Sequence, residues 1–102
     1  MDVKYKKKGK ELFIYVYGEL DEYNSKFLRA VIDDLIIKNL DVEKVIFDLS
    51  GLSFMDSTGI GLLIGRYKKL KSLNIKTYLT GATINIEKVI EISGLYDIMP
   101  IY

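Results

Sequence analysis

The sequence predicts one α/β domain in which helices pack on a mixed, mainly parallel β-sheet. Segments with the apolar pattern of strands alternate along the chain with segments whose apolar residues recur every three or four positions, as in helices. Strands that alternate with helices pair in parallel through right-handed crossovers, and a leading pair of strands adds antiparallel character. The expected order is ββαβαβαβ in a single domain, 1–102, because 102 residues suffice for one core.

The first three elements are predicted from periodicity and turn residues. Residues 3–8 and 12–17 form a strand pair joined at Gly9, and the second strand ends at residues 18–21. A helix follows from Tyr23, and Asn39 stops it. The expected apolar face of this helix consists of Phe27, Ala30, Val31, Leu35 and Ile36.

The second half continues the alternation. Residues 45–49 are nearly all apolar, which suits a strand covered on both faces, and residues 50–56 are expected to form a loop. A helix begins at Ser57, residues 75–79 form a strand, and a third helix ends at Gly94. Residues 98–101 are expected to form a last short strand at an edge of the sheet, because Pro100 lacks a backbone donor. The expected apolar face of the second helix consists of Ile60, Leu63, Ile64, Tyr67, Leu70 and Leu73.

The composition excludes several classes of function. The chain has no cysteine and no histidine, so thiol chemistry, disulfides and the commonest general base and metal ligand are absent. We therefore predict no metal, no cofactor and no enzymatic activity. The net charge of +1 gives no reason to expect direct nucleic-acid binding, and the lysines at positions 4–10 suit a solvated edge strand. No signal peptide and no run of about 20 apolar residues is present, which predicts a cytoplasmic protein without a membrane segment. Nothing in the sequence demands more than a monomer, so a monomer is expected.

The stretch FMDSTGIG, residues 54–61, combines two hydroxyls with an acid and two glycines. It is not an esterase elbow, because Met55 stands where G-x-S-x-G requires glycine, and no histidine is available for a catalytic relay. Gly59, Gly61 and Gly65 partly match the dinucleotide-binding glycine pattern, although their spacing differs and a loop separates them from the preceding strand. A small nucleotide-binding domain that uses this helix is therefore the alternative from another class of function.

A purely structural interpretation also accounts for part of this stretch. Asp56 or Ser57 caps the helix, while Gly61 and Gly65 let the helix approach the sheet. However, each glycine inside a helix costs about 0.5–1 kcal/mol relative to alanine, so the glycines call for compensation. The first helical turn offers free N–H groups and a positive dipole end, which favour a phosphate. We therefore predict that Ser57 is a phosphate acceptor whose activating groups belong to another protein.

Residues 48–71, DLSGLSFMDSTGIGLLIGRYKKLK, resemble the signature of the bacterial anti-sigma factor antagonists of the STAS-domain family. In that family D-S-[ST]-G-[LI]-G opens a helix, and its first hydroxyl residue is the regulatory phosphorylation site, which corresponds to Ser57. Residues 18–21, GELD, match the family's G-x-[LIV]-D, and residues 92–95, ISGL, match its [IM]-[ST]-G-L. Family members commonly have a further C-terminal helix, whereas this sequence stops at Tyr102.

The resemblance implies a partner switch. The unphosphorylated antagonist binds an anti-sigma factor that is also a serine kinase, and so releases the sigma factor. Phosphorylation of Ser57 ends this binding, and a phosphoserine phosphatase restores it. Residues 65–68, GRYK, resemble the sporulation branch, which controls a forespore sigma factor, and the general stress-response branch is the alternative.

The partner surface is expected where the second strand ends and the second helix begins, because loops that follow parallel strands gather at one edge of a sheet. Asp21 is the candidate for a charged contact with a basic residue of the kinase, and the cap of a helix is its equally supported structural role. The expected surface consists of Gly18, Asp21, Asp56, Ser57, Thr58, Gly59, Ile60 and Gly61.

Overall fold

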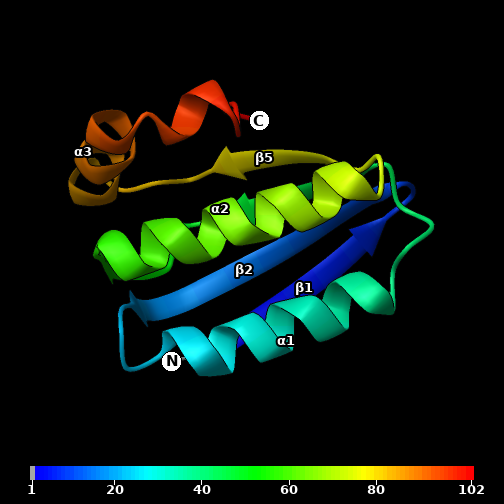
Figure 1. The fold of residues 1–102 in the computed structure, drawn as a ribbon, viewed down its shortest axis with the longest axis horizontal. Coiled ribbons are helices and arrows are strands. Elements are labelled where there is room, and N and C mark those ends of the chain that lie inside the picture. The colour runs from blue at the N-terminus through cyan, green and yellow to red at the C-terminus, as the bar shows by residue number, and fades with distance from the viewer. Residues whose placement is uncertain (1) are drawn as a thin grey trace.

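A five-stranded mixed sheet and three α-helices make up the computed structural model, which describes residues 2–102 (Figure 1). The sheet order is β1-β2-β3-β5, and β4 pairs with the far end of β2. β1 and β2 are antiparallel, whereas the remaining pairs are parallel, so the predicted α/β class with a mixed sheet is confirmed. The strands are β1 (Asp2–Lys8), β2 (Glu11–Leu20), β3 (Lys44–Asp48), β4 (Leu52–Met55) and β5 (Lys76–Thr80). The helices are α1 (Ser25–Ile37), α2 (Ser57–Ser72) and α3 (Ile84–Ser93).

The loop predicted over residues 50–56 is wrong, because it contains strand β4. Two of its side chains, Leu52 and Met55, are buried, and its backbone pairs in parallel with β2, Leu20 lying opposite Met55. β2 therefore continues three residues beyond its predicted end. Its first half pairs with β3, and its last residues pair with β4. A four-residue strand has too few positions to display a period, so only the pairing with β2 reveals it.

The predicted final strand over residues 98–101 is also wrong. A 3₁₀-helix, Leu95–Asp97, precedes this segment, and the strand-like contact within it is an isolated bridge between Ile101 and Leu79. The edge position expected for Pro100 is confirmed, since its carbonyl accepts a hydrogen bond from Leu79 N at 3.0 Å on the outer side of β5. The element order is therefore ββαββαβα, followed by the 3₁₀-helix.

Both long helices cover the same face of the sheet, side by side and with their first turns at the same end (Figure 1). Beneath them lie the alternate β2 residues Leu12, Ile14 and Val16, which are fully buried. α1 buries Leu28, Ile32 and Ile36, whereas Phe27 and Ala30 of the predicted face are exposed. Eight apolar residues nearly encircle α1, so periodicity alone allows two offset faces and contact with the sheet selects one.

The predicted face of α2 is partly confirmed. Leu63 and Leu70 are buried, Ile60, Ile64 and Tyr67 are half-buried, and Leu73 is exposed. Gly59 and Leu62, which were not predicted, complete the buried side of the helix.

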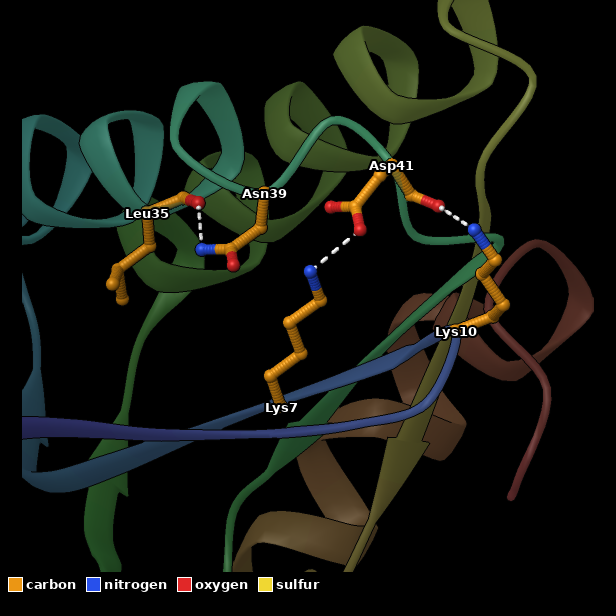
Figure 2. Close-up of polar contacts among 5 residues, drawn as sticks. All are labelled: Lys7, Lys10, Leu35, Asn39 and Asp41. Carbon is orange, nitrogen blue, oxygen red and sulfur yellow. Dashed lines mark hydrogen bonds and ion pairs between the residues drawn. The ribbon is translucent and has the colours of Figure 1, made fainter.

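The basic segment lies on the edge strand β1 and in the following turn, as predicted (Figure 2). Lys7 Nζ lies 2.6 Å from the Asp41 carboxylate, and Lys10 Nζ donates to the Asp41 carbonyl at 3.3 Å. The hydrogen bond from Lys7 is the main cause that lowers the pKa of Asp41. Asn39 stops α1 as predicted, since its side-chain amide donates to the free carbonyl of Leu35 at 2.7 Å. These three contacts hold the chain between α1 and β3 in place.

Candidate partner-binding site

Ser57 is the first residue of α2 and is exposed. The residue before it, Asp56, provides the N-cap, because its Oδ1 accepts a hydrogen bond from Gly59 N at 3.1 Å. Of the two caps that the sequence allowed, Asp56 is therefore the one used. The Ser57 hydroxyl makes no hydrogen bond within residues 2–102, so folding of the described chain does not require it.

Gly59 allows the end of β2 to contact the start of α2. A Cβ at Gly59 would lie 2.5 Å from the Leu20 carbonyl oxygen and 2.7 Å from Met55 Cγ. The backbone of Asp56 also donates to that Leu20 oxygen, at 3.3 Å. The expected neighbourhood of residues 18–21 and the helix start is therefore present in the fold, and one glycine makes it possible.

The other two glycines of α2 do not approach the sheet, which corrects the structural interpretation of the sequence. A Cβ at Gly61 or Gly65 would meet no atom within 4 Å. Gly59, in contrast, is buried under Leu20 and Met55, so it cannot offer its backbone to a pyrophosphate. The three glycines thus do not form the open turn of a dinucleotide site, and this geometry argues against the nucleotide-binding alternative.

Asp21 closes the turn that leads into α1. Its Oδ1 accepts a hydrogen bond from Asn24 N at 3.0 Å, and its carbonyl accepts one from Ser25 N at 2.9 Å. Asn24 in turn donates through its side chain to the Glu19 carbonyl at 3.1 Å. Asp21 therefore has a capping role, as the sequence allowed, but it caps the turn before α1 rather than the helix itself.

A hollow of about 420 Å³ lies beside Ser57, between the start of α2 and helix α3. We call it the apolar hollow. Its lining residues are Met55, Asp56, Ser57, Ile60, Val89, Ile92 and Ser93. Ile92 is 89% exposed although it is aliphatic, and Phe54 of β4 is 48% exposed. No partner contact on α3 was predicted, although a signal was available, since Ile92 lies out of phase with the buried Ile86 and Ile90.

A second hollow, of about 460 Å³, lies on the other side of Thr58, between α1 and α2. We call it the arginine hollow. Its lining residues are Ser25, Arg29, Thr58, Gly61, Leu62, Gly65 and Arg66. The two adjacent hydroxyls therefore face different surroundings, Ser57 an apolar one and Thr58 a basic one. This distinction does not follow from their sequence positions.

An ionic cluster joins α1 to α2 beneath the arginine hollow. Arg66 Nε lies 2.9 Å from Asp33 Oδ1, although their orientation forms no hydrogen bond, and Lys69 Nζ lies 3.5 Å from the same oxygen. Burial lowers the pKa of Arg66, the Asp33 carboxylate opposes this effect, and the charge of Arg29 adds to it. Arg29 is thus close enough to Arg66 for its charge to lower the pKa of Arg66.

Within residues 2–102, no group of three or more acidic side chains is arranged to hold a metal ion. None of the helices in this range is both long and apolar enough to cross a membrane.

The fold and the sequence both match known proteins. A family model of the STAS domain matches residues 2–102. An anti-sigma F factor antagonist of Lysinibacillus sphaericus is 39% identical over 82 residues, which cover 80% of this chain and 69% of the relative. An anti-sigma-B factor antagonist of Listeria monocytogenes is 33% identical over 88 residues, which cover 86% of this chain and 75% of the relative.

Solved structures extend this similarity to three dimensions. The unphosphorylated form of the anti-sigma factor antagonist SpoIIAA gives a TM-score of 0.79 at 31% identity, over 96% of this chain and 85% of that one. The phosphorylated form of SpoIIAA from Bacillus gives a TM-score of 0.70 at the same identity, over 96% of this chain and 88% of that one. These matches cover nearly the whole sheet with its helices, rather than one motif.

Proposed function

Because this chain belongs to the STAS-domain family, we propose that it is an anti-sigma factor antagonist whose binding is switched by phosphorylation of Ser57. In its unphosphorylated form it binds an anti-sigma factor that is also a serine kinase, and the sigma factor is released. The kinase transfers a phosphate from ATP to Ser57, which ends the complex, and a phosphoserine phosphatase resets the cycle. The protein acts as a cytoplasmic monomer and is not itself an enzyme.

The observation that supports this proposal best is the position of the Ser57 hydroxyl. It is exposed, lacks a hydrogen-bond partner within residues 2–102, and lies at the rim of the apolar hollow. A kinase can therefore reach it without unfolding the helix start. The chain contributes no histidine or cysteine as a base, so the kinase must supply the catalytic groups.

The same position explains why a phosphate would oppose binding. Phosphoserine has a charge of roughly −1.5 to −2 at neutral pH. At Ser57 this charge would lie between the Asp56 carboxylate and the apolar side chains Ile60, Val89 and Ile92. A partner that covers this surface would have to bury the charge against hydrocarbon, which is costly. A change of charge at one atom therefore suffices to weaken the complex, without rearrangement of the backbone.

The proposed partner surface joins the end of β2 to the start of α2. The end of β2 and the start of α2 lie at the same end of the molecule (Figure 1), and Ile92 of α3 lines the apolar hollow beside Ser57, so that it extends this surface. Asp21 uses Oδ1 to close its turn, and the other carboxylate oxygen remains for a basic residue of the kinase. The structural and the binding roles of Asp21 are therefore compatible.

We assign the protein to the branch of the forespore sigma factor rather than to the general stress response. The 39% identity to the anti-sigma F factor antagonist of Lysinibacillus sphaericus favours that branch, although a second anti-sigma F factor antagonist, of Paenibacillus polymyxa, is 33% identical and the anti-sigma-B factor antagonists of Listeria monocytogenes and Staphylococcus aureus are 33% and 34% identical. The residues 65–68, GRYK, favour the same branch.

The test is incubation with ATP and the anti-sigma F factor of Lysinibacillus sphaericus, whose activity is first verified on its own antagonist. Intact mass spectrometry should detect one added phosphate on the wild type, none on Ser57→Ala, and one on the matched control Thr58→Ala. Ser57→Ala should still bind the anti-sigma factor. An active kinase that leaves the wild type unmodified, or that modifies Ser57→Ala equally well, would refute the proposal.

A further inference from the structure

We propose that the arginine hollow between α1 and α2 receives a carboxylate side chain of the protein that docks at Ser57. This inference rests on the proposed function and adds the chemistry of a second contact. The hollow shares Thr58 and Gly61 with the proposed partner surface, so a partner bound there extends naturally over its rim. Its lining contains two arginines, two hydroxyl residues and no acidic residue.

The charges around the hollow are unbalanced. Arg66 and Lys69 share one carboxylate, that of Asp33, while Arg29 forms no ion pair within residues 2–102. Three cations therefore face a single anion in this part of the described chain. Arg29 and Arg66 also repel one another, since the charge of Arg29 lowers the pKa of Arg66. A carboxylate between the two guanidinium groups would relieve this repulsion and accept their N–H donors in the planar geometry that arginine offers.

The floor of the hollow is open because of Gly61 and Gly65. Both lie inside α2, where glycine lowers helix stability, and neither is required by neighbouring atoms, since an added Cβ would meet nothing within 4 Å. Their structural role is thus unexplained by the isolated fold. Two bare positions one turn apart leave room for a side chain of the partner to reach the arginines along the helix surface.

Arg29 can be tested against a matched control on the same helix. Arg29→Glu reverses a charge that lines the hollow, whereas Lys26→Glu makes the same change in charge at an exposed position that does not line it. The affinity for the anti-sigma F factor of Lysinibacillus sphaericus should fall about 10-fold or more for Arg29→Glu. It should change less than about threefold for Lys26→Glu. The melting temperatures of both variants report on folding.

Gly65→Ala provides an independent test of the same hollow. The added methyl group narrows the floor without a clash, so the melting temperature should stay equal or rise, while the affinity for the same anti-sigma factor falls several-fold. A lower affinity at an equal or higher melting temperature would show that the narrowed hollow, rather than a defect in folding, weakens binding. A defect in folding would lower stability together with affinity.

The outcomes distinguish this inference from the proposed function. If the wild type binds the anti-sigma factor and is phosphorylated, but Arg29→Glu binds as well as Lys26→Glu, the carboxylate contact is refuted and the proposed function stands. Unchanged affinity of Gly65→Ala refutes it as well. If the wild type neither binds the verified kinase nor is phosphorylated by it, the proposed function fails and the inference fails with it.

Discussion

Gly59→Ala tests whether the close contact between the end of β2 and the start of α2 determines stability. The new Cβ would lie 2.5 Å from the Leu20 carbonyl oxygen, 2.7 Å from Met55 Cγ and 2.9 Å from Leu20 Cγ. The first of these atoms belongs to the backbone and already accepts a hydrogen bond from Asp56 N. The strand therefore has to move away from the helix, and that hydrogen bond has to lengthen.

Two opposing effects decide how much stability Gly59→Ala loses. Overpacking of a well-packed core costs about 1–3 kcal/mol, whereas replacement of glycine by alanine inside a helix gains about 0.5–1 kcal/mol. The expected net loss for Gly59→Ala is about 1–2 kcal/mol, which corresponds to a fall in melting temperature of roughly 5–15 °C for a domain of this size. Gly61→Ala is the matched control, because its Cβ meets nothing and only the helical gain remains.

Thermal and urea unfolding followed by circular dichroism measure both variants. Gly59→Ala should be less stable than the wild type, and Gly61→Ala should be more stable by about 0.5–1 kcal/mol. If Gly59→Ala is as stable as the wild type, the close contact does not constrain the site. If both variants lose stability equally, Gly59 and Gly61 do not differ in packing as inferred.

Three further predictions concern the switch, the apolar hollow and a half-buried phenol. Ser57→Asp should weaken anti-sigma factor binding while the melting temperature stays within a few degrees of the wild type, because an acidic residue in the first helical turn suits the helix dipole; wild-type affinity would contradict the switch. Ile92→Ser should lower the affinity for the anti-sigma factor without loss of stability. Ile84 is 76% exposed on the same helix but does not line the apolar hollow, so Ile84→Ser should leave the affinity unchanged in binding assays. Burial and a hydrogen bond to Glu87 raise the pKa of Tyr96 to about 12, so its contribution to stability is complete below pH 10 and is lost as the pH rises towards 12. Absorbance titration should therefore show a tyrosine ionisation near pH 12 that is absent in Tyr96→Phe, whereas the ionisation of Tyr102, whose pKa is raised mainly by its hydrogen bond to Glu11, remains in that variant. Persistence of the step near pH 12 in Tyr96→Phe would refute the assignment.

Much of this fold follows from local sequence. The long strand β2, the three helices and their ends at Asn39 and Gly94 were predicted, because each depends on residues within a few positions of one another. Gly94 ends α3 with a φ of 72°, a left-handed conformation that glycine adopts without strain. The segment around Ser57 was likewise recognisable, because its acid, hydroxyls and glycines are adjacent in the chain.

The tertiary structure alone decided the features that depend on distant segments. β4 exists because residues 52–55 meet the end of β2, and the buried face of α1 was selected by the sheet from two that the sequence permits. Three glycines in one helix look alike in sequence, yet only Gly59 contacts Leu20, while Gly61 and Gly65 face an open hollow. The sequence by itself predicted Ser57 as the phosphate acceptor, and packing determined that Ser57 faces apolar side chains whereas Thr58 faces arginines. The physical reason is that periodicity records which side chains are apolar, whereas the distance between two surfaces depends on every element packed between them.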